Sequence, residues 1–250
     1  MKKYKGLQIL ILNLVALALL GACSISVDSQ DQELGQLPSD EWDYVALGSV
    51  NYNRTYPVLY AAHIEEDQAV EVNLVDRRTL LKTTGMLFDM IQEDETLRAT
   101  LSEAEVVTIW PGGEDMFNAM VIKDQDCEPV IQALKNDLDA IVTEIIELRG
   151  DQATILRLMD HYIWVKRLKD KGIFEEKLAC MQAADQYIQD VGSKYSIPVA
   201  GVGFAFNGPD GLDDPVDKGF IGSDGFRTNA AGDAEVARLL HELGYEPTIP

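Results

Sequence analysis

From residue 43 to the end of the chain, segments with the hydrophobic pattern of a strand alternate with segments that have the pattern of a helix. Short apolar runs of strand length occupy residues 43–47, 69–75, 105–110, 153–159 and 197–202. Between them, apolar residues recur at steps of three and four, which predicts helices at residues 55–65, 80–91, 128–148 and 174–191, and a last helix that Asn229 caps. Strands that alternate with helices in this way predict a parallel sheet with helices on both faces. We therefore expect one α/β domain at residues 43–250, a three-layer α/β/α sandwich around a five-stranded parallel sheet.

The segment before this domain has the pattern of an export signal. Three lysines near the start precede an apolar run at residues 7–20, which is too short to span a membrane comfortably. The run ends in Leu20-Gly21-Ala22-Cys23, which resembles the lipobox of bacterial lipoprotein signals. The resemblance implies a signal peptide at residues 1–22 and a lipid on Cys23, which would anchor the exported protein to the extracellular or periplasmic face of a membrane. The alternative is an ordinary secretory signal that ends beside a cysteine by chance. Under the first interpretation, residues 23–42 are the lipidated cysteine followed by a flexible polar tether.

The chain is strongly acidic, with a formal net charge of −21. Removal of residues 1–22 takes away three lysines and no acidic residue, so 21 basic residues become 18 and the charge becomes −24. A surface of this charge repels phosphate backbones, which argues against nucleic acid as a partner.

Two cysteines remain after the signal peptide, Cys127 and Cys180. In an exported protein an isolated pair favours a disulfide over a metal site or a catalytic thiol. Two separate buried thiols are the alternative.

The stretch from Trp42 to Asn53, WDYVALGSVNYN, reads as a buried strand that ends in a turn at Gly48. In open α/β sheets, ligands bind beside the carboxyl ends of such strands. The stretch is similar to the first motif of the SGNH (GDSL-type) hydrolases, and the similarity continues in VVTIWPGGED at 106–115 and in the run at 206–245. The resemblance implies a flavodoxin-like SGNH hydrolase fold and a site for carboxylic-ester chemistry.

The chemistry of that family needs four kinds of group. A Ser attacks the ester carbonyl, a His takes its proton, an Asp orients the His, and a backbone N–H, a Gly and an Asn donate hydrogen bonds to the oxyanion. Aligned without a gap, Ser49 stands at the Asp position of the first motif and Val50 at the Ser position. Val50 has no nucleophilic atom, but Ser49 reaches the nucleophile position if the turn has lost one residue. The Gly of the second motif is absent from residues 75–78.

The third and last motifs also depart from the family. In the third, Gly113 is followed by Glu114, which places a hydrogen-bond acceptor where the family has the Asn donor. In the last, Asp224 remains but Arg227 stands at the His position, and an arginine cannot act as a general base. We expect Arg227 to pair with Glu114 or Asp224 in the former site; the alternative is that these residues have drifted to an exposed rim.

A replacement for the missing histidine is not evident. We interpret His63, His161 and His241 as surface or packing residues. Trp110 and Trp164 either line a ligand cleft or pack at strand ends. We expect no cofactor and no metal.

These features predict a membrane-anchored lipoprotein whose degenerate SGNH domain is a non-catalytic binding module. An acylated or glycan ligand follows from the resemblance alone. A weak or altered carboxylic-ester hydrolase that uses Ser49 is the enzymatic alternative, and an envelope protein with a vestigial cleft is the structural one.

Overall fold

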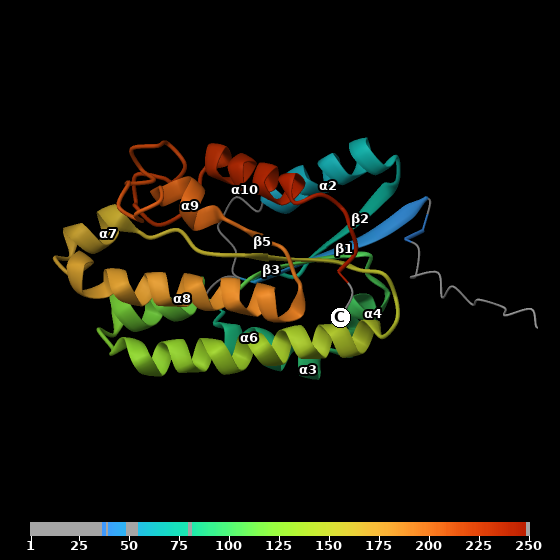
Figure 1. Ribbon diagram of the computed structural model, residues 1–250, viewed down its shortest axis with the longest axis horizontal. Coiled ribbons are helices and arrows are strands. Elements are labelled where there is room, and N and C mark those ends of the chain that lie inside the picture. The colour runs from blue at the N-terminus through green and yellow to red at the C-terminus, as the bar shows by residue number, and fades with distance from the viewer. Residues whose placement is uncertain (1–36, 39, 49–54, 80–81, 249–250) are drawn as a thin grey trace, which may run out of the picture. The chain divides into compact units, whose positions relative to one another are not determined.

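Five parallel strands form the centre of the domain, in the order β2-β1-β3-β4-β5 (Figure 1). A computed structural model describes residues 37–38, 40–48, 55–79 and 82–248. The strands are β1 (Glu41–Gly48), β2 (Glu71–Asp76), β3 (Val106–Trp110), β4 (Ile155–Met159) and β5 (Val199–Ala200). All strand pairs are parallel, so the predicted five-stranded parallel sheet is confirmed.

Long helices cover both faces of this sheet (Figure 1). On one face α2 (Tyr56–Gln68) packs beside α10 (Ala230–Glu242). On the other lie α3 (Thr84–Glu93), α4 (Glu95–Glu103), α6 (Cys127–Arg149) and α8 (Phe174–Tyr195). The three-layer α/β/α sandwich is therefore confirmed. Among the described helices, none is long and apolar enough to cross a membrane.

Four short helical segments follow the carboxyl ends of strands or connect the long helices. They are α5 (Gly113–Met116), the π-helix η1 (Phe117–Ile122), α7 (Val165–Asp170) and α9 (Val202–Asn207). The hydrophobic pattern did not predict them, because a segment of one or two turns shows too few repeats of its period.

The bounds of most predicted elements shift by a few residues, and in two elements the shift has a clear local cause. The helix expected at 80–91 begins at Thr84, because the Thr83 side chain caps it by accepting from the Met86 N–H. It ends before Asp94, which caps the separate helix α4 through the Leu97 N–H. The strand expected at 197–202 is reduced to β5, since Pro198 has no N–H for a sheet ladder and the chain enters α9 at Val202.

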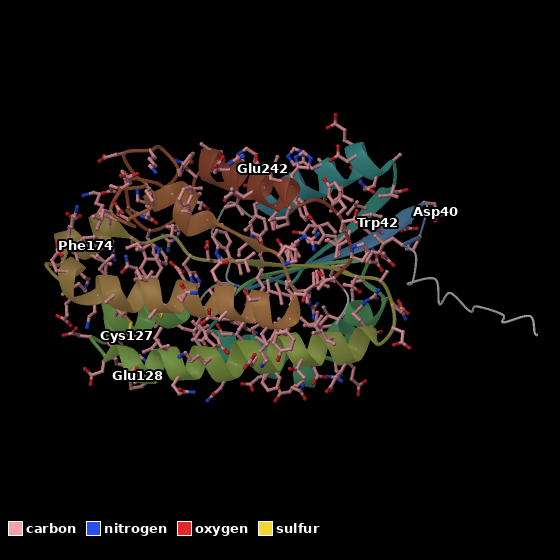
Figure 2. The ribbon with its side chains drawn as sticks, in the orientation of Figure 1. Asp40, Trp42, Cys127, Glu128, Phe174 and Glu242 are labelled. Atoms are coloured by element: carbon pink, nitrogen blue, oxygen red, sulfur yellow. A yellow bond between two sulfur atoms is a disulfide. The ribbon has the colours of Figure 1, made fainter. Side chains whose placement is uncertain are left out.

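A disulfide joins the two long helices α6 and α8. It links Cys127, the first residue of α6, to Cys180 in α8, with 5.7 Å between their Cα atoms (Figure 2). The predicted pairing is confirmed, and the bond fixes the start of α6 against the neighbouring helix.

The C-terminal tail after α10 is held by one buried side chain of the sheet. Arg157 in β4 is fully buried and donates hydrogen bonds to the backbone oxygens of Leu156, Gly244 and Glu246. It also donates to Thr248 Oγ1. Every one of these acceptors is neutral, so within the described residues both Nη groups are held by hydrogen bonds and not by an ion pair, while the buried Nε has no hydrogen-bond partner.

Candidate functional site

The carboxyl ends of β1 and β3 lie together, with Gly48 directly opposite Trp110 in the parallel register. The chain crosses to β2 on one side of β1 and to β3 on the other, so this is the point where the strand order reverses. Open α/β sheets bind ligands at such a switch point. Ser49 and Val50 follow Gly48 directly but lie outside the described residues, as does Cys23.

A small cleft opens beside this switch point, with a cavity volume of about 50 Å³. We call it the aromatic cleft, because four of its seven described lining residues are aromatic. Its lining residues are Trp110, Gly113, Glu114, His161, Tyr162, Trp164 and Phe226. Trp110 and Trp164 both line this cleft and are both buried, so each residue fits the two alternatives that the sequence left open.

The loop after β3 forms one wall of the cleft. Gly112 has φ +82°, and a Cβ there would lie 2.9 Å from the His161 ring, so the turn requires glycine. The Gly112 N–H donates to Thr84 Oγ1, which in turn donates to the Asp115 carboxylate. This chain of hydrogen bonds positions Glu114, whose side chain is 5% exposed and lines the cleft as expected from its motif position.

His161 forms another part of the wall, directly after β4. Its backbone N–H donates to Asp185 Oδ1, and its ring Nδ1 lies 3.3 Å from the same oxygen. The residue is 4% exposed, and both ring nitrogens are buried without a hydrogen-bond partner of good geometry among the described residues. His161 is therefore a packing residue as predicted, but its packing places it in the cleft beside a carboxylate, which the sequence did not indicate.

Buried acidic groups surround the cleft wall. Asp160 accepts from the Gly203 N–H and from Gln189 Nε2, and burial, with a further contribution from Asp185, raises the pKa of Asp160 to about 6. Burial also raises the pKa of Asp185 and that of Asp115, while the hydrogen bonds that each accepts oppose the shift. The protein thus holds several carboxyl groups in surroundings that disfavour their charge.

Asp224 and Arg227 form an ion pair at the rim. Arg227 Nη1 lies 3.0 Å from Asp224 Oδ2, and the side chains are 35% and 39% exposed. Asp224 Oδ1 also accepts from the N–H groups of Phe226 and Arg227, which lowers the pKa of Asp224 against the effect of its partial burial. The expected pairing of Arg227 with Asp224 is confirmed, and the partial exposure agrees with the rim position that we gave as the alternative.

The same loop places Phe226 in the cleft. The Tyr162 hydroxyl donates to the Phe226 backbone oxygen at 2.7 Å, and the Phe226 ring lies 5.2 Å from that of Trp164. Local sequence gave no sign of this contact, because residues 162 and 226 come together only through the fold.

An ion pair lies in the segment where the resemblance led us to expect a second-motif glycine. Arg78 is 3% exposed and donates to both carboxylate oxygens of Asp76 at 2.9 Å. Its guanidinium carbon lies 4.4 Å from the centre of the Tyr56 ring, and that ring packs against Trp110 at 5.5 Å. A side chain and its counter-charge therefore occupy space near the base of the cleft.

The other two histidines lie apart from the cleft. His63 on α2 and His241 on α10 stack with ring centres 4.5 Å apart, and His241 Nε2 lies 2.7 Å from Asp67 Oδ2. This stack joins the two helices of one layer and agrees with the predicted surface or packing role. Within the described ranges, no cluster of three or more His, Cys, Asp or Glu residues is arranged to hold a metal ion.

Sequence reasoning missed Asp185, Tyr162 and Phe226 as parts of this site. A usable signal existed for residues 160–162, because they follow the carboxyl end of a strand in the same way as Gly48 and Trp110 do. No comparable signal marked Asp185, which lies within the long helix α8.

Comparison with known proteins supports the fold. No protein-family model matches the chain, and a search of curated proteins gave no match. Among solved structures, a lipase from a goat rumen metagenome is 17% identical with a TM-score of 0.68, over 82% of this chain and 98% of that lipase. A lipase/acylhydrolase from Enterococcus faecalis is 16% identical with a TM-score of 0.57, over 81% and 95% of the two chains.

An acetyl xylan esterase from Geobacillus stearothermophilus is also similar, with 13% identity and a TM-score of 0.58 over 84% of this chain and 98% of the esterase. Each of these proteins is matched over nearly its whole length. At such low identity the similarity shows the fold alone, which is the α/β fold of the SGNH lipases and esterases.

Proposed function

We propose that this chain, which has the fold of the SGNH hydrolases, is a membrane-anchored lipoprotein whose domain binds a ligand without the usual Ser–His mechanism. The ligand would be an acylated or glycan molecule, one end of which enters the aromatic cleft. Lipid on Cys23 would hold the domain at the outer face of the membrane that it crosses during export.

The observation that carries this proposal is the ion pair between Arg227 and Asp224, with 3.0 Å between Nη1 and Oδ2. The resemblance aligns Arg227 with the family's catalytic histidine. A guanidinium keeps its proton at any physiological pH, so it cannot take a proton from a nucleophile. Loss of this base alone removes most of the rate enhancement of a catalytic triad.

The wall of the cleft supports the same conclusion. Glu114, 5% exposed, brings a carboxyl group to the position of the family's amide donor. A carboxylate accepts hydrogen bonds and repels a developing oxyanion, whereas an oxyanion hole needs donors. On this proposal, groups that cannot do the same chemistry replace both the base and one oxyanion donor.

A second candidate function is an altered carboxylic-ester hydrolase that uses Ser49. One observation favours it: His161 lies directly after β4, and its Nδ1 is 3.3 Å from the Asp185 carboxylate. A triad also places a carboxylate beside its His, but the contact here lacks the geometry of a hydrogen bond. Against it, Nε2 of the same ring is buried, so it has no open path to a substrate or a nucleophile in this arrangement.

Labelling with a fluorophosphonate, together with hydrolysis of a short p-nitrophenyl ester, separates the two functions. The wild-type protein is compared with Ser49→Ala and His161→Gln. We expect no labelling and no turnover from any of the three. Labelling and turnover by the wild type that are lost in both variants would show a hydrolase and overturn the binding proposal.

The membrane anchor is tested separately. Cells that produce the full chain are grown with an alkyne-tagged fatty acid, and Cys23→Ser is the matched control. We expect the tag on the wild type in the membrane fraction and its absence from the variant. Equal tagging of both would contradict lipidation at Cys23.

A further inference from the structure

We propose that the aromatic cleft binds a small organic cation, a methylated ammonium group. This inference rests on the proposed binding function, because it names the chemical group that the cleft would take. Neither the acylated nor the glycan ligand class specifies such a group.

The lining of the cleft is the first argument. Trp110, Tyr162, Trp164 and Phe226 present aromatic rings to one small space. The ring centres of Trp110 and Tyr162 lie 6.3 Å apart with 64° between their planes, and those of Trp164 and Phe226 lie 5.2 Å apart. Faces of aromatic rings attract cations through their quadrupole, and several such faces around one space are the usual recognition site for quaternary ammonium groups.

Charge is the second argument. Glu114 is the one carboxyl group among the described lining residues, and it is 5% exposed. Behind the cleft wall, the Asp185 carboxyl group accepts a hydrogen bond from the His161 N–H, and Asp160 immediately precedes His161. A carboxylate in such a desolvated position interacts with a ligand cation more strongly than it would in water. A negatively charged ligand would meet repulsion from the same group.

Two of the arginines near the cleft are each paired with a carboxylate. Arg78 is paired with Asp76 through two hydrogen bonds of 2.9 Å, and Arg227 is paired with Asp224 at 3.0 Å. The guanidinium carbon of Arg227 already lies 5.4 Å from the centre of the Phe226 ring. This contact shows that a ring of the cleft accepts a cation in its own surroundings.

Size is the third argument. A cavity needs about 10–15 Å³ for each water-sized group, so about 50 Å³ holds roughly three to five such groups. A trimethylammonium head, with one nitrogen and three methyl groups, is of this size. A sugar ring or a fatty acyl chain is much larger, so only an end group of such a ligand fits the cleft.

Choline and a neutral molecule of the same shape test the proposal on the wild-type protein. The probe is choline and its isostere is 3,3-dimethyl-1-butanol, in which carbon replaces the charged nitrogen. Isothermal titration calorimetry measures both, and acetate serves as a small anion. We expect choline to bind at least about tenfold more tightly than the isostere, and acetate not to bind.

Two variants assign the binding to the cleft. Glu114→Gln removes the carboxylate from its wall, and Glu105→Gln removes the same charge just before the opposite end of β3. We expect the first to weaken choline binding about tenfold or more and the second to change it less than about twofold. Trp164→Leu removes one ring and is expected to weaken choline binding as well, so the assignment does not depend on a single variant.

Several results would overturn the proposal. They are equal binding of choline and its neutral isostere, no choline binding at millimolar concentration, or unchanged affinity in both Glu114→Gln and Trp164→Leu once circular dichroism shows them folded. The probes are unreactive, so the outcome is independent of the labelling experiment above. A protein that reacts with fluorophosphonate yet prefers choline to its isostere would refute the non-catalytic function and leave this inference standing.

Discussion

Opening the disulfide between Cys127 and Cys180 should destabilise the domain by an amount that follows from its position in the chain. The bond closes a loop of 53 residues between the start of α6 and the middle of α8. In the chain-entropy treatment a crosslink of this length removes about 14 cal/mol/K from the unfolded state, or about 4 kcal/mol at 25 °C. For a domain of this size that corresponds to about 8–16 °C in Tm.

Reduction of the wild-type protein measures the contribution of the disulfide to the free energy of unfolding without a change in sequence. Urea unfolding is followed by circular dichroism with and without a reductant. The control is the double variant Cys127→Ala with Cys180→Ala, measured under the same two conditions. We expect the reductant to lower the free energy of unfolding of the wild type by about 4 kcal/mol and to leave the double variant unchanged.

Two outcomes would refute this reasoning. A loss below about 1 kcal/mol, with thiol titration showing that the bond has opened, would mean that the crosslink does not restrict the unfolded chain as the loop length requires. Two free thiols in the untreated, denatured protein would mean that the bond does not form, and would also contradict an oxidising location for the domain.

Three further predictions concern stability, each measured by urea unfolding. Arg157→Met leaves the backbone acceptors of the C-terminal tail without their donor and should cost about 3 kcal/mol, so unchanged stability would contradict this role. Gly48→Ala places a Cβ 2.2 Å from the Trp110 backbone oxygen and should lower the free energy of unfolding by about 3 kcal/mol or more. In the control Gly150→Ala the Cβ meets open space, so the loss should be only about 1 kcal/mol, for the positive φ. Equal losses in the two variants would refute the contact argument. Burial raises the pKa of Asp160 to about 6 from an unfolded value near 4, so the folded state binds the proton more tightly and this stabilisation is lost as pH rises from about 4 through 6. The free energy of unfolding of Asp160→Asn should therefore fall less than that of the wild type over this range. An equal fall in both proteins would contradict the assignment.

The repeating elements of the fold follow from local sequence. Strands β1 to β4 and the longest helices are long enough to be recognised from their apolar residues, whereas β5 has only two residues. Asn229 caps α10, because its side chain accepts from the N–H groups two and three positions ahead. The same holds for the Asp224–Arg227 pair, because three residues of chain limit how far apart these side chains can lie. The sequence left Glu114 as another partner for Arg227, and the structure shows the pair with Asp224.

The candidate site depended on the tertiary structure to a greater degree. The turns after Gly48 and Trp110 were predictable, because the carboxyl ends of parallel strands meet at one edge whatever the rest of the chain does. The aromatic cleft was not predictable, since Tyr162 reaches Phe226 across 64 residues and His161 reaches Asp185 across 24. Periodicity and motif spacing describe neighbours along the chain, whereas the partners of a buried side chain are set by how the layers pack. The sequence by itself therefore determined the sheet and the edge where a ligand would bind, and the packing of its helices and loops decided that this edge carries an aromatic, acidic cleft.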